Sequence, residues 1–131
     1  MFVLDPVLAA DTVFLHKFKL SDLRLMNDSQ YPWFILVPRV PDATEIIQLE
    51  PEQQQQLLAE SKMVSEMLTE AFLAEKLNIA ALGNVVSQLH IHHIGRFKQD
   101  AAWPKPVWGV HPPEPYTENE LSVIKERVEA Y

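Results

Sequence analysis

Three of the five histidines in this chain, His90, His92 and His93, fall within four positions of the segment "QLHIHHIGR". On a β-strand alternate side chains share a face, so Gln88, His90 and His92 would point one way and His93 the other. With a rise of about 3.3 Å per residue, His90 and His92 would lie roughly 6.6 Å apart at the backbone. Their rings can therefore converge on a single atom.

Two imidazoles on one strand face have three possible roles. They can be hydrogen-bonded structural residues, as single histidines in strands often are. They can be two ligands of a catalytic zinc ion, which needs a third protein ligand such as His16, His111 or a carboxylate, although no spacing indicates one. They can also serve nucleophilic catalysis on phosphorus, in which one imidazole attacks and a neighbouring group stabilises the leaving oxygen. His93, on the mainly aliphatic face, is expected to be structural.

Attack on phosphorus needs a phosphate-binding loop, and "NIAALGNVVSQLH" supplies a candidate directly before the histidines. Asn78, Gly83 and Asn84 are turn-prone, and Gly83 would let main-chain amides approach an anion. Arg96, just past the strand, is either a phosphate contact or a solvated strand end.

Composition limits the classes of function. The 131 residues, 47% of them hydrophobic, are enough for one domain over residues 1–131. The absence of cysteine excludes disulfides, a thiolate nucleophile and Cys-rich zinc sites. A net charge of −7 argues against general nucleic-acid binding, but one phosphate needs only a few local donors. With neither a signal segment nor a long apolar run, we expect a cytoplasmic protein that does not bind membranes.

The elements that must position the histidines follow from periodicity and capping. Apolar spacing predicts a long helix from Pro51 to Lys76, and "TENE" at Thr117 is a capping box that opens a second helix ending near Ala130. The arm 101–116 carries five of the ten prolines, which excludes a central strand or helix there. Segments with strand character are 12–18, 23–27, 33–39, 77–82 and 87–96. This order predicts an α+β domain with an antiparallel sheet of about five strands, the long helix on one face and His90 and His92 on the other.

The segment "LGNVVSQLHIHHIGR" resembles the signature of the histidine triad (HIT) superfamily, a Gly-Gln-x-Val-x ahead of His-φ-His-φ-His-φ-φ. Gln88 occupies the place of the first histidine, His90 the second and His92 the third. "LMNDSQYPWFILVPR" is similar to the family's nucleotide-binding strand pair, and "WPKPVWG" to a tryptophan-proline segment that some members carry. The resemblance covers most of residues 20 to 110.

The resemblance implies a dimeric HIT-like α+β fold that binds purine nucleotides or dinucleoside polyphosphates and hydrolyses them or transfers a nucleotidyl group. No cofactor is obligatory, although a divalent cation can accompany the substrate phosphates. His90 would be the nucleophile that forms a nucleotidyl-histidine intermediate, and His92 would hydrogen-bond the phosphate or leaving group. Asn27 matches a sugar or base contact, with Asp28 as the alternative, and Asn78 lies one residue from the family's loop asparagine.

Two departures from the family pattern affect the expected activity. Gln88 cannot titrate near neutral pH, so it retains an orienting role beside His90 and loses an acid/base role. Val85 stands where many members carry Ser or Thr, which removes one side-chain contact to phosphate. The favoured function is a hydrolase, ahead of a transferase, and both are ahead of a nucleotide-binding module without turnover; a metal site at His90 and His92 is the remaining alternative.

The resemblance also predicts a homodimer built around the helix and strand that follow the nucleotide-binding pair. The arm 101–116 should lie near the partner subunit or over the site. Its Trp103 and Trp108 would either stack on a base or a partner subunit, or pack the arm against the domain.

Overall fold

The computed structural model describes all 131 residues and contains one five-stranded antiparallel sheet, in the strand order β1-β2-β3-β5-β4. The strands are β1 (Thr12–Lys17), β2 (Ser21–Met26), β3 (Trp33–Pro38), β4 (Lys76–Ala80) and β5 (Ile91–Arg96). The helices are α1 (Pro6–Asp11), α2 (Pro51–Glu70) and α3 (Glu118–Ala130), with a short 3-10 helix at Ile46–Gln48. The predicted α+β architecture is confirmed.

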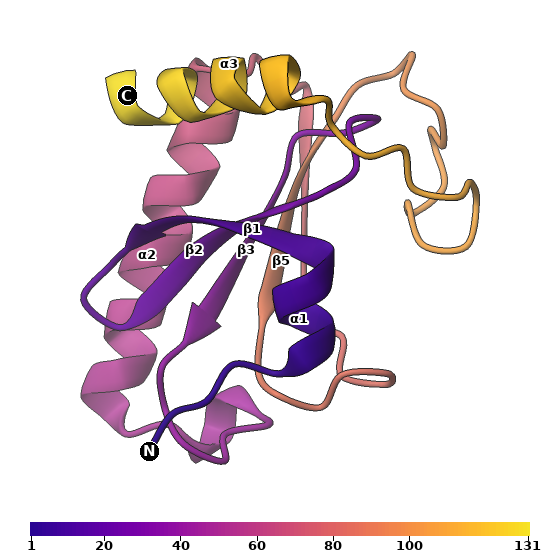
Figure 1. Ribbon diagram of the computed structural model, residues 1–131. Coiled ribbons are helices and arrows are strands. Elements are labelled where there is room, and N and C mark those ends of the chain that lie inside the picture. Colours follow the sequence, from indigo (N-terminus) through magenta and orange to yellow (C-terminus); the bar gives the residue numbers. More distant parts are fainter.

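Helices and loops cover both faces of the sheet. In Figure 1 the long helix α2 lies behind the sheet and the short helix α1 lies in front of it. The α2 side is filled by Leu23, Leu25, Phe34, Leu36, Leu57, Val64, Met67, Leu68, Leu89 and Ile91. The opposite side is filled by Leu8, Trp33, Ile35, Val37, Val86, Ile94, Ala102 and Val107. All six residues of the central strand β3 are therefore buried, which explains why its sequence "WFILVP" is almost continuously apolar.

Two helix predictions need correction. The long helix ends at Glu70 instead of Lys76, because Leu73 takes a left-handed backbone conformation (φ 59°) and the N–H of Ala74 turns back to the carbonyl of Leu68 at 3.0 Å. The chain is then free to begin β4 at Lys76. Helix α1 was not predicted, although the dipeptide Asp5-Pro6 places a capping carboxylate and a proline at its start.

The C-terminal predictions agree with the structure. Thr117 caps α3 by accepting a hydrogen bond from the Glu120 N–H at 3.1 Å, and the Glu120 carboxylate accepts one from the Thr117 N–H at 2.9 Å. Residues 101–116 form neither a helix nor a strand, as their prolines indicate. None of the helices combines the length and the apolar character that crossing a bilayer requires.

We predict that Gly95→Ala destabilises the fold by about 1–3 kcal/mol, the usual effect of overpacking a core. A Cβ at this position of β5 would lie 2.9 Å from Pro32 Cγ, 3.1 Å from Ala74 Cβ and 3.2 Å from Leu68 Cδ2. Gly83→Ala is the matched control, because the nearest atom to its added Cβ is the Val86 carbonyl oxygen at 3.6 Å. Urea unfolding of the two variants measures the difference, and equal midpoints would contradict the prediction.

Candidate functional site

His90 and His92 lie together on the face of the sheet opposite α2, as the strand alternation predicts. Their ring centroids are 4.9 Å apart in an edge-on arrangement, and both residues are buried. His93 points to the other side, where its Nε2 lies 2.7 Å from the Ser61 hydroxyl of α2. Burial lowers the pKa of His93 to about 4, so it stays neutral and acts as a structural residue of the core.

The tautomer of the neutral His90 ring is set by the main chain. Its Nδ1 lies 2.7 Å from the carbonyl oxygen of Gln88, which can only accept a hydrogen bond. Nδ1 therefore carries the hydrogen, and in the neutral ring Nε2 has a free lone pair. His90 thus presents the nitrogen that a nucleophile requires.

The His92 ring is held in the opposite tautomer by a different partner. The indole Nε1–H of Trp33 donates to His92 Nδ1 at 2.9 Å, so the hydrogen of the neutral ring is on Nε2. Burial, followed by the neighbouring His90 and His93, lowers the pKa of His92 to about 3. At neutral pH His92 therefore offers a fixed N–H donor beside the His90 ring.

Two pockets meet at His90. The larger, of about 260 Å³, contains both His90 and His92 and is walled by α1, the segment 82–86 and the arm. Its apolar lining consists of Val7, Leu8, Met26, Leu82, Val85, Val86 and Trp108. The smaller, of about 190 Å³, is polar and is lined by Thr44, Glu45, Gly83, Asn84, Ser87 and Gln88 among others. An apolar compartment and a polar compartment that share His90 suit a ligand with a ring at one end and an anionic group at the other.

The arm lies over the site in the same chain. The ring of Trp108 is 5.1 Å from that of His92 and 5.7 Å from that of Trp33, both edge-on. Trp103 has another position, over the guanidinium of Arg96 at 5.6 Å. One of the two arm tryptophans therefore belongs to the larger pocket, and the other packs the arm against the domain.

The side chain of Gln88 makes no hydrogen bond with His90. Its Oε1 accepts a hydrogen bond from the Asp5 N–H at 2.8 Å, and its Nε2 donates to the Val3 carbonyl at 2.8 Å. The strand begins only at Ile91, so Gln88 lies outside the ladder and turns toward the N-terminal segment. The orienting role expected of this side chain is performed by the Gln88 main-chain carbonyl.

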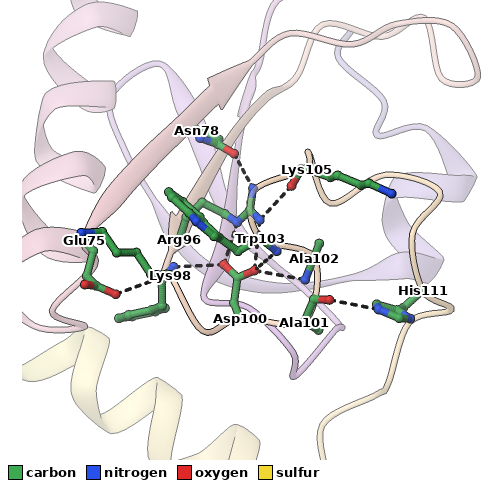
Figure 2. Close-up of polar contacts among 11 residues, drawn as sticks. Glu75, Asn78, Arg96, Lys98, Asp100, Ala101, Ala102, Trp103, Lys105 and His111 are labelled. Carbon is green, nitrogen blue, oxygen red and sulfur yellow. Dashed lines mark hydrogen bonds and ion pairs between the residues drawn. The ribbon is translucent and has the colours of Figure 1, made fainter.

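Arg96 and Asn78, both candidate nucleotide contacts, hydrogen-bond to each other and to the protein interior instead. Figure 2 shows the Arg96 guanidinium donating to the Asp100 carboxylate at 2.8 and 3.0 Å, to Asn78 Oδ1 at 2.7 Å and to the Lys105 carbonyl at 2.8 Å. Arg96 is only 1% exposed, so it is not a solvated strand end. Neither residue lines a pocket with His90.

Asn27 and Asp28 hold the end of the arm. Asn27 Oδ1 accepts from the Tyr116 N–H at 2.9 Å, and Asp28 Oδ1 accepts from the Glu114 N–H at 3.3 Å. Neither residue lines the pockets at His90, whereas Asp11, which sequence reasoning missed, lines the larger one. The dipeptide Asp5-Pro6 could have indicated α1, but no local pattern indicates that this helix packs beside His90.

The zinc alternative has no third ligand among the proposed histidines. The His16 ring packs against Phe18 at 4.9 Å, and His111 Nε2 lies 3.0 Å from the Ala101 carbonyl. No group of three His, Asp or Glu side chains is arranged so that it could hold a metal ion.

Comparison with known proteins agrees with this geometry. The model of the HIT domain matches residues 8–99. A histidine triad protein from Marinobacter aquaeolei is 52% identical, with a TM-score of 0.97 over 99% of this chain and 95% of that chain. A histidine triad protein from Bradyrhizobium japonicum is 45% identical, with a TM-score of 0.96 over 98% of this chain and 96% of that chain.

A more distant structure shares the fold alone. The hypothetical histidine triad nucleotide-binding protein of Sulfolobus tokodaii is 14% identical, with a TM-score of 0.69 over 91% of this chain and 82% of that chain. The comparison with curated proteins gave no match.

The low pKa of His92 predicts a specific loss of stability in acid. As the pH falls from about 6.5 toward the folded-state pKa of about 3, the unfolded chain protonates this histidine and the folded chain does not, so the free energy of unfolding falls as pH falls. Well below pH 6.5 the slope is about 1.4 kcal/mol per pH unit for each such histidine.

Urea unfolding across this pH range should show a shallower slope for His92→Asn than for the wild type. The exposed His16 provides the matched control, because His16→Asn should leave the slope unchanged. Equal slopes in the wild type and His92→Asn would contradict the prediction.

Proposed function

Because the chain belongs to the histidine triad family, we propose that it is a nucleotide-binding hydrolase that acts through a nucleotidyl-histidine intermediate on His90. The observation that carries this proposal is the hydrogen bond from His90 Nδ1 to the Gln88 carbonyl, which leaves a free lone pair on Nε2 of a residue that lines both pockets.

The proposed reaction has two displacements on phosphorus. His90 Nε2 attacks the phosphorus of the bound nucleotide, a P–N bond forms, and the P–O bond to the leaving group breaks. Water then attacks the same phosphorus, the P–N bond breaks, and the imidazole is regenerated while the proton of water passes to solvent. The Nε2–H of His92 hydrogen-bonds a phosphate oxygen in both steps and stabilises the charge that develops there.

The protonation states of the site favour anhydrides as substrates. Gln88 cannot release a proton, and the low pKa of His92 keeps that ring neutral, so neither protonates a leaving group readily. A phosphate leaving group departs from an anhydride as an anion, whereas the amine of a phosphoramidate must first be protonated. Dinucleoside polyphosphates are therefore favoured over phosphoramidates and simple esters.

The two pockets suggest how the nucleotide is bound. The nucleoside would occupy the larger pocket, with its base against Trp108 and its hydroxyls near the Asp11 carboxylate. The phosphates would lie at the Gly83-Asn84 loop in the polar pocket. Glu45 also lines that pocket, and its negative charge is compatible with a divalent cation that arrives with the phosphates.

A panel of adenosine and guanosine dinucleoside polyphosphates and phosphoramidates, assayed with and without chelator, tests this function. Anhydrides should be cleaved fastest, and His90→Ala should abolish turnover while nucleotide affinity changes by less than about tenfold, roughly 1.4 kcal/mol. His16→Ala, at an exposed histidine outside the site, should retain full turnover.

Mass spectrometry of rapidly quenched protein should then find a nucleotidyl adduct on His90. Turnover that survives His90→Ala would overturn the proposed nucleophile. Activity that is lost on chelation and restored by zinc would favour the metal alternative. Transfer of the nucleotidyl group to an added acceptor would favour a transferase. Binding without turnover would favour a nucleotide-binding module.

The proposal includes a homodimer formed through α2 and β4. β4 is an edge strand, since it pairs with β5 alone. Beside it is an open hollow of about 570 Å³, lined in part by Ile46, Leu58 and Ile79, whose side chains are exposed. An open strand edge beside exposed apolar side chains is typical of a surface that pairs with a second copy.

Sedimentation should therefore show a dimer for the wild type and a monomer for Leu58→Glu, because a buried carboxylate at the subunit contact would be unpaired. Val123→Glu, at an exposed position on α3, is the matched control and should remain dimeric. A monomeric wild type that cleaves nucleotides would contradict this part of the proposal.

A further inference from the structure

The Gln88 side chain bridges two main-chain groups on either side of Leu4. It accepts from the Asp5 N–H and donates to the Val3 carbonyl, each at 2.8 Å. A residue in a neighbouring parallel β-strand would make this same pair of bonds through its own main chain. One side-chain amide thus replaces a strand partner for residues 3–5, which we call the N-terminal strap.

We infer that Gln88 is a positioning residue that holds the N-terminal strap and, through it, the helix α1 that walls the nucleotide pocket. This inference rests on the proposed function for the identity of the ligand. It assigns the glutamine at the first triad position to substrate binding through α1, and not to the chemistry at His90.

A glutamine can form this bridge and a histidine cannot. The amide carries its donor and its acceptor on one carbon, side by side, so both reach main-chain groups of the same extended segment. The two nitrogens of an imidazole point away from each other across the ring. A histidine at position 88 could therefore bond to Asp5 or to Val3 but not to both.

The strap is directly connected to the pocket. Asp5 is the N-cap of α1, where its carboxylate accepts from the Val7 N–H at 2.8 Å. α1 then places Val7, Leu8 and Asp11 in the wall of the pocket that contains His90 and His92. The bond from Gln88 to the Asp5 N–H therefore fixes the start of the helix that closes one side of the site.

The strap has few other polar anchors. Val3 is 71% exposed, while Phe2 and Leu4 pack partly against the core under α1. Loss of the Gln88 bridge should thus loosen the strap and α1 without unfolding the domain. The far end of α1 stays attached to the sheet, because the Asp11 carbonyl accepts from the Asn27 N–H at 3.0 Å.

Amide hydrogen exchange without ligand tests whether the Gln88 bridge holds the N-terminal strap and α1. Gln88→Ala should speed exchange of the Asp5 amide and the first turn of α1 by about tenfold, the scale of one lost hydrogen bond, and Gln88→His, which can keep only one of the two bonds, should speed it less. Gln54→Ala is the matched control. Gln54 lies on α2, away from the site, and its side-chain amide donates to the Leu49 carbonyl at 3.0 Å. Unchanged exchange in both Gln88 variants would overturn the inference.

Kinetics on the best anhydride of the panel tests the positioning role. Gln88→Ala should raise KM about fivefold to tenfold and leave kcat within about twofold, because α1 contributes to binding and not to the displacement. A fall in kcat at constant KM would overturn the inference and make Gln88 an orienting residue of His90. If the wild type binds no nucleotide, the proposed function fails, while the exchange comparison still decides whether Gln88 holds α1.

Discussion

The buried ion pair between Arg96 and Asp100 holds together the parts of the molecule that surround the site. Burial alone would raise the pKa of Asp100, but hydrogen bonds from Arg96 and from the main-chain N–H groups of Phe97, Trp103 and Ala102 outweigh it and lower the pKa to about 2. The same guanidinium binds β4 and the arm (Figure 2). A buried charge that loses its partner is costly, so β5, which carries Arg96, is fixed relative to β4 and to the arm. The arm must then pass back over the sheet, and this path brings Trp108 to His92.

Successive side chains in and just before β5 alternate between the core face and the pocket face of the sheet. Leu89, Ile91 and His93 face α2 and complete the core, while His90 and His92 face the pocket. Each pocket histidine has its Nδ1 engaged, one with a carbonyl and one with an indole, so both rings present Nε2 to the ligand side. One nitrogen carries a lone pair and the other a hydrogen. This difference arises from the neighbours of the two rings and not from the rings themselves.

The sequence predicts the parts of this protein that depend on local patterns. Alternation identified the strands and the shared face of His90 and His92, and the capping box at Thr117 identified the start of α3. The end of α2 was missed, because a helical apolar pattern continues past the left-handed Leu73. The partners of Gln88 and Asn27 were missed for a different reason: they are separated from these side chains by 83 and 89 positions in the chain. These contacts form only once the two ends of the chain have packed on the sheet. No local sequence pattern predicts that packing.

The position of the tryptophans gives the site an optical property. Two of the three, Trp33 and Trp108, contact His92 directly, and the third lies over Arg96. Indole emission depends on the polarity around the ring and on quenching groups in contact with it. A ligand that displaces solvent from Trp108, or that disturbs the hydrogen bond between Trp33 and His92, will therefore change the intrinsic fluorescence of the protein. Ligand binding in the pocket can be followed by intrinsic tryptophan fluorescence, with no label added.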